Sequence, residues 1–159
     1  MRKRYEIQQS LGTIPISDVT INMKSRHELP AILRALQHIF GKADLRESIL
    51  GMLEAEIQKG KLATGRQGMS MWEILVMGSV RLGMDLNYDS LEDLVNNHKS
   101  LRGILGVELE SGFGGGKSYH IQTIKDNVGL LSEELLSKLN VLIVEAGHNL
   151  IKKKGRPYG

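Results

Sequence analysis

The chain has 159 residues, of which 41% are hydrophobic and 25% are charged, which is ordinary for a globular domain. It contains no cysteine, which excludes a disulfide framework and a thiolate metal site. No apolar run approaches the roughly 18 residues of a membrane span, so a single globular domain without a membrane partner is expected.

Basic residues gather at both ends of the chain, although the formal net charge is only +3. The two groups are Arg2, Lys3 and Arg4 near the start, and Lys152, Lys153, Lys154 and Arg156 near the end. Such groups suit an anionic partner, and they also occur as solubilising ends, so both interpretations stay open.

Residues 1–24 are predicted to form an extended arm, because they hold Gly12 and Pro15 and few helix signals. Ile14 and Ile16, and then Val19 and Ile21, stand two residues apart. This spacing is typical of one or two short strands.

A helical domain is expected over residues 25–154. In its first helix, apolar residues recur at helical spacing up to Phe40; the helix starts at Ser25 or Pro30 and ends at Gly41. The second helix starts at Asp44 and stops at Gly60. Its inward face holds Leu45, Ile49, Met52, Leu53 and Ile57.

The segment from Met71 to Leu82 is apolar on nearly every face and is predicted to be a helix buried on several sides. Ser70 precedes Glu73 by three residues, the spacing of a capping box that starts this helix. Trp72 is expected in the core rather than on a base-stacking surface, since aromatic residues make up only 4% of the chain.

Two short helices are expected after Gly83, the first capped by Asp89 or Ser90. Their apolar positions have the general layout of a helix-turn-helix, although the turn at 98–100 lacks glycine and Gly106 ends the second helix early. A helix-turn-helix-like module is therefore kept as a candidate.

Residues 106–118 contain several glycines and are predicted to form a surface loop. The loop ends in Gly-Lys-Ser, but position 111 is Ser where a phosphate-binding loop needs glycine, and no strand precedes it. A nucleotide-binding enzyme is thus the least favoured alternative. The five histidines show no zinc-binding spacing, so no metal or other cofactor is expected.

A helix from Tyr119 to Val128, capped by Ser118, is the candidate recognition element. With Ile121, Ile124 and Val128 inward, its outward residues are predicted to be His120, Gln122, Thr123, Lys125 and Asn127. Amide side chains suit adenine edges and a lysine suits guanine or phosphate. An ordinary solvated helix face has the same composition, so chemistry alone leaves both interpretations open.

The last helix is expected to begin after Ser132 and to run to Lys154, before a tail of residues 155–159. Its first turn holds Glu133 and Glu134 and its last turn three lysines, which complements the helix dipole. The predicted fold is mainly α: a bundle of six or seven helices with a short extended or β N-terminal arm.

Three segments together carry a resemblance to a known family: Gly65–Gly68 before the buried helix, RLGMDLNYDSLEDL, and NNHKSLRGILG. With YHIQTIKDNVGLL they resemble the N-terminal domain of insertion-sequence transposases of the InsH-like type, the ISNCY group above all. The resemblance covers roughly Arg4 to Lys154. The DDE catalytic domain of this family, which uses Mg²⁺, follows that region, and the chain is expected to be a truncated or frameshifted copy.

The resemblance implies binding of double-stranded DNA at transposon ends, assembly during transposition, and no catalysis by this region alone. It implies a cytoplasmic, nucleoid-associated protein whose further partners are a second copy or a full-length transposase. The implied phosphate contacts are Arg66, Arg81, Lys99, Arg102 and Lys117. The alternative is a helical oligomerisation module that binds DNA only non-specifically.

Overall fold

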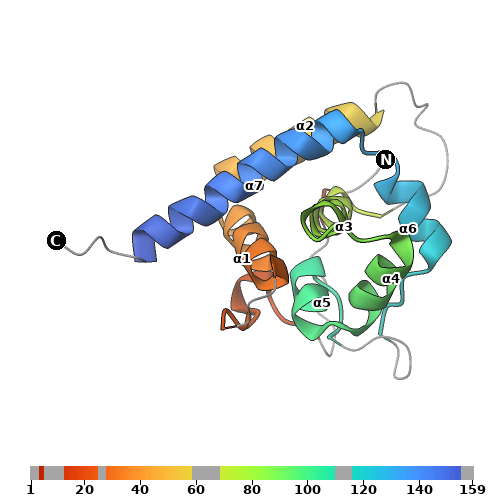
Figure 1. The fold of residues 1–159 in the computed structure, drawn as a ribbon, viewed down its shortest axis with the longest axis horizontal. Coiled ribbons are helices and arrows are strands. Elements are labelled where there is room, and N and C mark those ends of the chain that lie inside the picture. Colours follow the sequence, from red (N-terminus) through yellow and green to blue (C-terminus); the bar gives the residue numbers. More distant parts are fainter. Residues whose placement is uncertain (1–3, 6–12, 25–27, 59–68, 110–115, 155–159) are drawn as a thin grey trace.

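The computed structural model describes residues 4–5, 13–24, 28–58, 69–109 and 116–154, with side chains up to position 145 in the last helix (Figure 1). Within these ranges the chain forms seven α-helices and a single 3-10 helix, η1 (Ile16–Asp18), and it has no β-strand. The expectation of a mainly α bundle is therefore confirmed.

Helix α3 (Met71–Gly83) is the centre of the bundle and contacts every other α-helix (Figure 1). On one side lie α1 (Glu28–Gly41), α2 (Ala43–Gln58) and α7 (Glu133–Lys154). On the other side lie α4 (Tyr88–Asn97), α5 (Lys99–Leu105) and α6 (Ile121–Val128). All residues from Met71 to Val80 are buried, as expected of a helix that is apolar all round.

The predicted capping box starts α3: Ser70 Oγ accepts from the Glu73 amide at 3.2 Å, and Glu73 Oε1 accepts from the Ser70 amide at 3.0 Å. Trp72 is 1% exposed, and its indole Nε1 donates to the Ile104 carbonyl at 2.7 Å. The prediction that Trp72 belongs to the core is confirmed.

The described part of the N-terminal arm is packed against the bundle, and the expected strands are absent from it. The Gln37 amide on α1 donates to the carbonyls of Ile16 at 3.0 Å and Val19 at 2.9 Å. A Cβ on Gly103 of α5 would stand 2.7 Å from a Val19 methyl carbon, so this glycine permits the close approach of the arm.

The helix-turn-helix candidate gains no support from the packing of α5, which is buried over most of its length. His98 alone joins α4 to α5, and it caps α5 by accepting the Leu101 amide on Nδ1 at 3.1 Å. Every residue from Leu101 to Leu105 is buried, so α5 has no free face to enter a DNA groove. The N-cap of α4 is Asn87, which accepts from the Ser90 amide at 2.8 Å, rather than Asp89 or Ser90.

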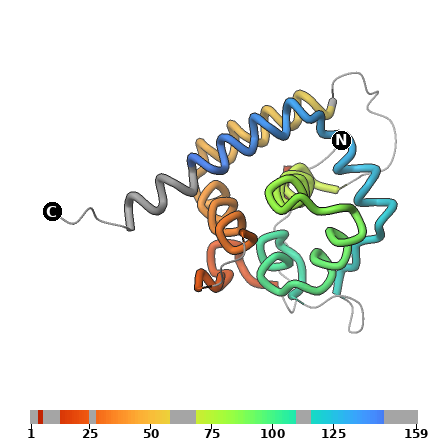
Figure 2. The backbone as a smooth tube through the Cα atoms, in the orientation of Figure 1, coloured from red at the N-terminus to blue at the C-terminus, as the bar shows by residue number. Residues whose placement is uncertain are grey.

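Helices α2 and α7 lie side by side and run in opposite directions, and α7 also packs against α1 (Figure 2). As predicted, Ser132 Oγ accepts from the Leu135 amide in the first turn of α7, at 3.1 Å. Among the described residues, no helix combines the length and apolar content needed to cross a bilayer.

Candidate nucleic-acid interface

Arg102 was predicted to contact phosphate, and the structure corrects this prediction. Its side chain is fully buried, at 0% exposure. The guanidinium donates to three carbonyl oxygens: those of Val95 at 2.9 Å, Glu108 at 2.7 Å and Lys117 at 2.6 Å. Arg102 therefore joins α4 to both ends of the segment between α5 and α6, and it has no access to a ligand.

Lys117 is a second predicted phosphate contact that is engaged within the fold. Its ammonium lies 2.9 Å from Glu73 Oε2, and the Tyr119 hydroxyl donates to the same oxygen. Burial alone would raise the pKa of Glu73, but the charge of Lys117 and the hydrogen bonds from Tyr119, Lys117 and Ser70 outweigh it and lower the pKa. Burial and the Glu73 charge raise the pKa of Tyr119 well above its usual value. This cluster fastens Lys117 and Tyr119 to α3.

The candidate recognition helix begins at Ile121, and its N-cap is His120 rather than Ser118. The imidazole Nδ1 of His120 accepts from the Gln122 amide at 3.2 Å. His120, Gln122, Thr123 and Lys125 are exposed as predicted, but Asn127 is only 6% exposed. The Asn127 amide donates to the Thr123 carbonyl at 2.7 Å and accepts from the Met69 amide at 3.3 Å. Asn127 therefore positions α6 and is withdrawn as a base-reading residue.

The surface around α6 carries charges of both signs. Gln122 Nε2 donates to Asp126 Oδ1 at 2.9 Å, which takes up one of its two N–H donors and places a carboxylate beside it. Helix α4, which packs against α6, has the exposed carboxylates of Asp89 and Asp93. Negative charge beside a recognition helix opposes the approach of DNA.

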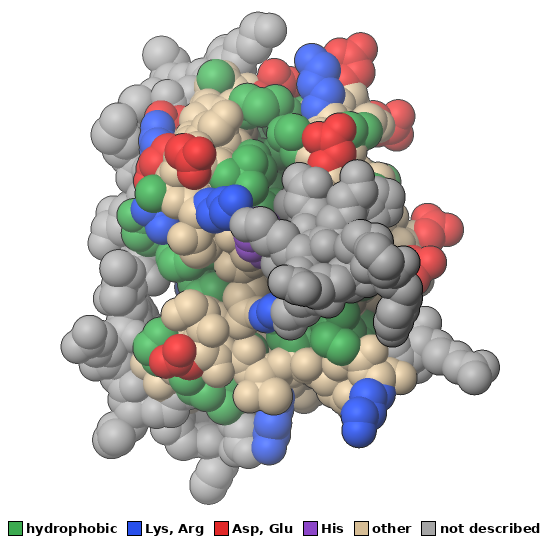
Figure 3. Space-filling model, turned by 90° about the vertical axis from the view of Figure 1, so that its left-hand side faces the viewer, with side chains coloured by type: hydrophobic (Ala, Val, Ile, Leu, Met, Phe, Trp, Pro, Cys, Tyr) green, Lys and Arg blue, Asp and Glu red, His purple; other side chains and the backbone are tan. Residues whose placement is uncertain are grey.

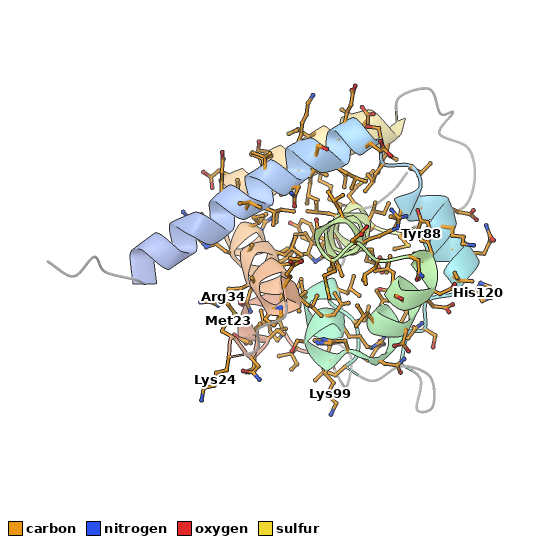
Figure 4. The ribbon with its side chains drawn as sticks, viewed as in Figure 1. Met23, Lys24, Arg34, Tyr88, Lys99 and His120 are labelled. Atoms are coloured by element: carbon orange, nitrogen blue, oxygen red, sulfur yellow. The ribbon has the colours of Figure 1, made fainter. Side chains whose placement is uncertain are left out.

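The remaining predicted contacts lie in different places. The Arg81 guanidinium is half-buried over the Tyr88 ring, 4.2 Å from its centroid, and its Nε has no hydrogen-bond partner within the described part of the chain. Lys99 is exposed at the edge of the molecule near the start of α5 (Figure 4). Arg66 lies outside the described residues. The structure therefore does not bring the predicted residues together into one site.

A different set of basic residues comes from the arm, from α1 and its C-terminal end, and from the start of α5, and we call it the basic face: Lys24, Arg34, His38, Lys42 and Lys99. Figure 4 shows Lys24, Arg34 and Lys99 toward the lower part of the molecule. Arg34 and His38 stand four residues apart on α1 and therefore share one stripe of that helix, and Lys42 follows just after α1 ends at Gly41. Lys24, Lys42 and Lys99 are exposed, and Arg34 and His38 are half-buried.

In Figure 3, Lys and Arg side chains are interspersed with Asp and Glu side chains, and Figure 4 labels Lys24 and Arg34 beside the arm and α1. The Arg34 guanidinium donates to Gln37 Oε1 at 2.8 Å, which orients it next to the arm. Three residues close in sequence to members of the basic face have exposed carboxylates: Asp18, Glu28 and Asp44. Of these residues only Lys99 was among the predicted contacts, although basic residues at positions 34, 38 and 42 stand four apart in the sequence.

An open cavity of about 460 Å³ lies between the arm, α1 and the junction of α4 with α5. Its lining is mainly apolar and includes Ile21, Leu29, Leu33, Met84 and Leu94, with His98 as the one imidazole. Burial lowers the pKa of His98, so its ring is neutral at pH 7. The described residues contain no group of three His, Cys, Asp or Glu side chains that could hold a metal ion.

Comparisons with protein-family models, curated proteins and solved structures give no match for this chain.

Proposed function

We propose that this chain binds duplex DNA, as the end-binding and assembly part of an insertion-sequence transposase, and that it meets the DNA backbone through the basic face. The sequence resemblance over the region from Arg4 to Lys154 supports the assignment to the transposase family. The single observation that supports contact with DNA is the basic face along α1. The basic face takes the place of Arg102, whose guanidinium is buried, and of Lys117, whose ammonium is paired with Glu73.

The spacing along α1 suits a phosphate backbone. Four residues of an α-helix rise about 6 Å, so Arg34 and His38 are offset along the axis by roughly two base-pair steps of 3.4 Å. Lys42 extends the series just beyond Gly41, where α1 ends. Cations at its last turn also complement the partial negative charge of the helix C-terminus.

Helix α6 offers a second, separate surface for DNA. It makes no contact with α1, and the two lie on opposite sides of α3 (Figures 1 and 2). Its exposed Gln122 and Lys125 can meet base edges or phosphates, although Asp126 and the carboxylates of α4 work against this. The two surfaces therefore have to be tested separately.

Two double variants with the same loss of charge separate them. Lys24→Ala/Lys42→Ala removes two exposed lysines of the basic face, and Lys125→Ala/Lys138→Ala removes two exposed lysines of α6 and α7. Affinity for a labelled duplex is measured by fluorescence anisotropy at fixed salt and at a chain concentration at which wild type and both variants sediment as monomers, after thermal melts confirm that both variants fold.

The proposal expects the first double variant to bind at least tenfold more weakly than the second, since each lost phosphate contact lowers affinity and non-contacting lysines matter little. If only the second variant lost affinity for the duplex, the DNA contact would have to be assigned to α6 instead. Equal and small losses would mean that neither surface holds the duplex, which favours the oligomerisation module.

A further inference from the structure

The outward face of α7 carries two valines that no other part of the described chain covers. Val141 is 56% exposed and Val144 is 45% exposed, while Leu139 and Ile143 on the opposite face are buried. Ser137, Lys138, Asn140 and Glu145 around the two valines are exposed as well. The helix continues to Lys154, past its contact with α1 (Figure 1).

The spacing of this face matches a helix–helix seam. Positions 137, 141 and 144 are separated by four and three residues, which is the a/d spacing of a heptad repeat. Val141 and Val144 occupy an a and a d position, in that order. Lys138 and Glu145 then both occupy e positions, directly beside the seam, with opposite charges.

We propose that a second copy of this chain covers this face, with the two α7 helices antiparallel. In that orientation Val141 of each copy lies opposite Val144 of the other, and e positions flank e positions. Lys138 of one copy then faces Glu145 of the other, and the same pair forms again by symmetry. In a parallel pair, Lys138 would instead face Glu133 and Glu145 would face the neutral Asn140. The antiparallel arrangement is thus the one that pairs both charged residues beside the valines, and cross-linking decides between the two.

The association is weak. Two valines per copy provide a small part of the about 1,200 Å² that a stable interface buries. It needs no DNA and does not depend on the proposed function, so each can fail without the other.

Sedimentation velocity over a range of concentrations, without DNA and at low salt, tests the pairing. Val144→Glu should abolish association, and Asn140→Glu, on the same helix beside the seam, is the matched control. Lys138→Glu and Glu145→Lys should each weaken association about five- to tenfold, because each creates two like-charge pairs. The double variant Lys138→Glu/Glu145→Lys restores the pairs of opposite charge and should recover most of the wild-type association.

Orientation is tested by cross-linking, which the absence of cysteine makes simple. Antiparallel pairing puts two copies of Val141→Cys about 5 Å apart along the axis and two copies of Ser137→Cys about 16 Å apart. A short bis-maleimide should therefore join the first and leave the second, whereas a parallel pair would be joined at both positions. A chain that stays monomeric up to about 1 mM, or a charge swap that restores nothing, overturns the proposal.

Discussion

Replacing Arg102 by Met tests whether a buried cation holds the two ends of the α5–α6 segment in place. Methionine has a similar length and fills much of the same space, but it donates no hydrogen bonds. The carbonyls of Val95, Glu108 and Lys117 would lose donors that now lie 2.6–2.9 Å away. The substitution therefore removes three charged hydrogen bonds with a small change of volume.

The expected cost is about 3–5 kcal/mol in the free energy of unfolding. Each buried carbonyl left without a donor costs about 1–3 kcal/mol, and removing a desolvated charge returns part of the sum. Burial lowers the pKa of Arg102, which is a sign that its charge is kept at a desolvation cost. Since a small protein has about 5–15 kcal/mol in total, the variant should fold but be clearly weakened.

Urea denaturation measures this directly. With a dependence of about 2 kcal/mol per M, the midpoint should fall by roughly 2 M at unchanged slope. Lys125→Met loses the same charge from an exposed position and should change stability by less than about 0.5 kcal/mol. If Arg102→Met shifts the midpoint no more than Lys125→Met does, the carbonyl cluster is not a structural anchor.

Three further perturbations address other parts of the fold. Trp72→Ala should cost about 3–5 kcal/mol, because a fully buried indole and its bond to the Ile104 carbonyl are lost; an unchanged thermal melt would place Trp72 at the surface. Asn127→Ala should lower the melting temperature and leave DNA preference intact, and a selective loss of binding without destabilisation would return Asn127 to the recognition surface. The pKa of Glu73 is lowered in the folded state, so its contribution to stability is full above the unfolded pKa near 4.5 and is lost as pH falls through the folded pKa. In Glu73→Gln the free energy of unfolding should therefore fall less steeply below pH 5 than in the wild type. An identical acid profile in the two proteins would contradict the ion pair with Lys117.

Local signals in the sequence predicted most of the helices. The capping box at Ser70 and Glu73 and the cap at Ser132 depend only on residues three or four apart, and both were read correctly. Long apolar patterns also predicted α1, α3 and α7 correctly, because the sequence of a helix of three or more turns shows which face is apolar. Histidine caps at positions 98 and 120 were missed, since Ser, Thr, Asp and Asn are the usual caps.

The candidate site was harder to predict because burial is decided by distant neighbours. Helices α5 and α6 have only two turns each, so their own sequences do not tell which polar residues face inward. Arg102 is buried because residues 108 and 117 converge on it, and Asn127 because Met69 packs beside it. The basic face likewise combines an arm lysine, residues of α1 and Lys99 of α5, which are far apart in the sequence.

The salt dependence of duplex binding is the most direct measurement of the central claim. If Lys24, Arg34, Lys42 and Lys99 each neutralise a phosphate, the logarithm of affinity should fall with the logarithm of salt concentration with a slope of about −3.6, or roughly a hundredfold between 50 and 200 mM. In Lys24→Ala/Lys42→Ala the slope should be shallower by about 1.8. A flat response of the wild-type chain, or the same slope in both proteins, would contradict DNA binding through the basic face.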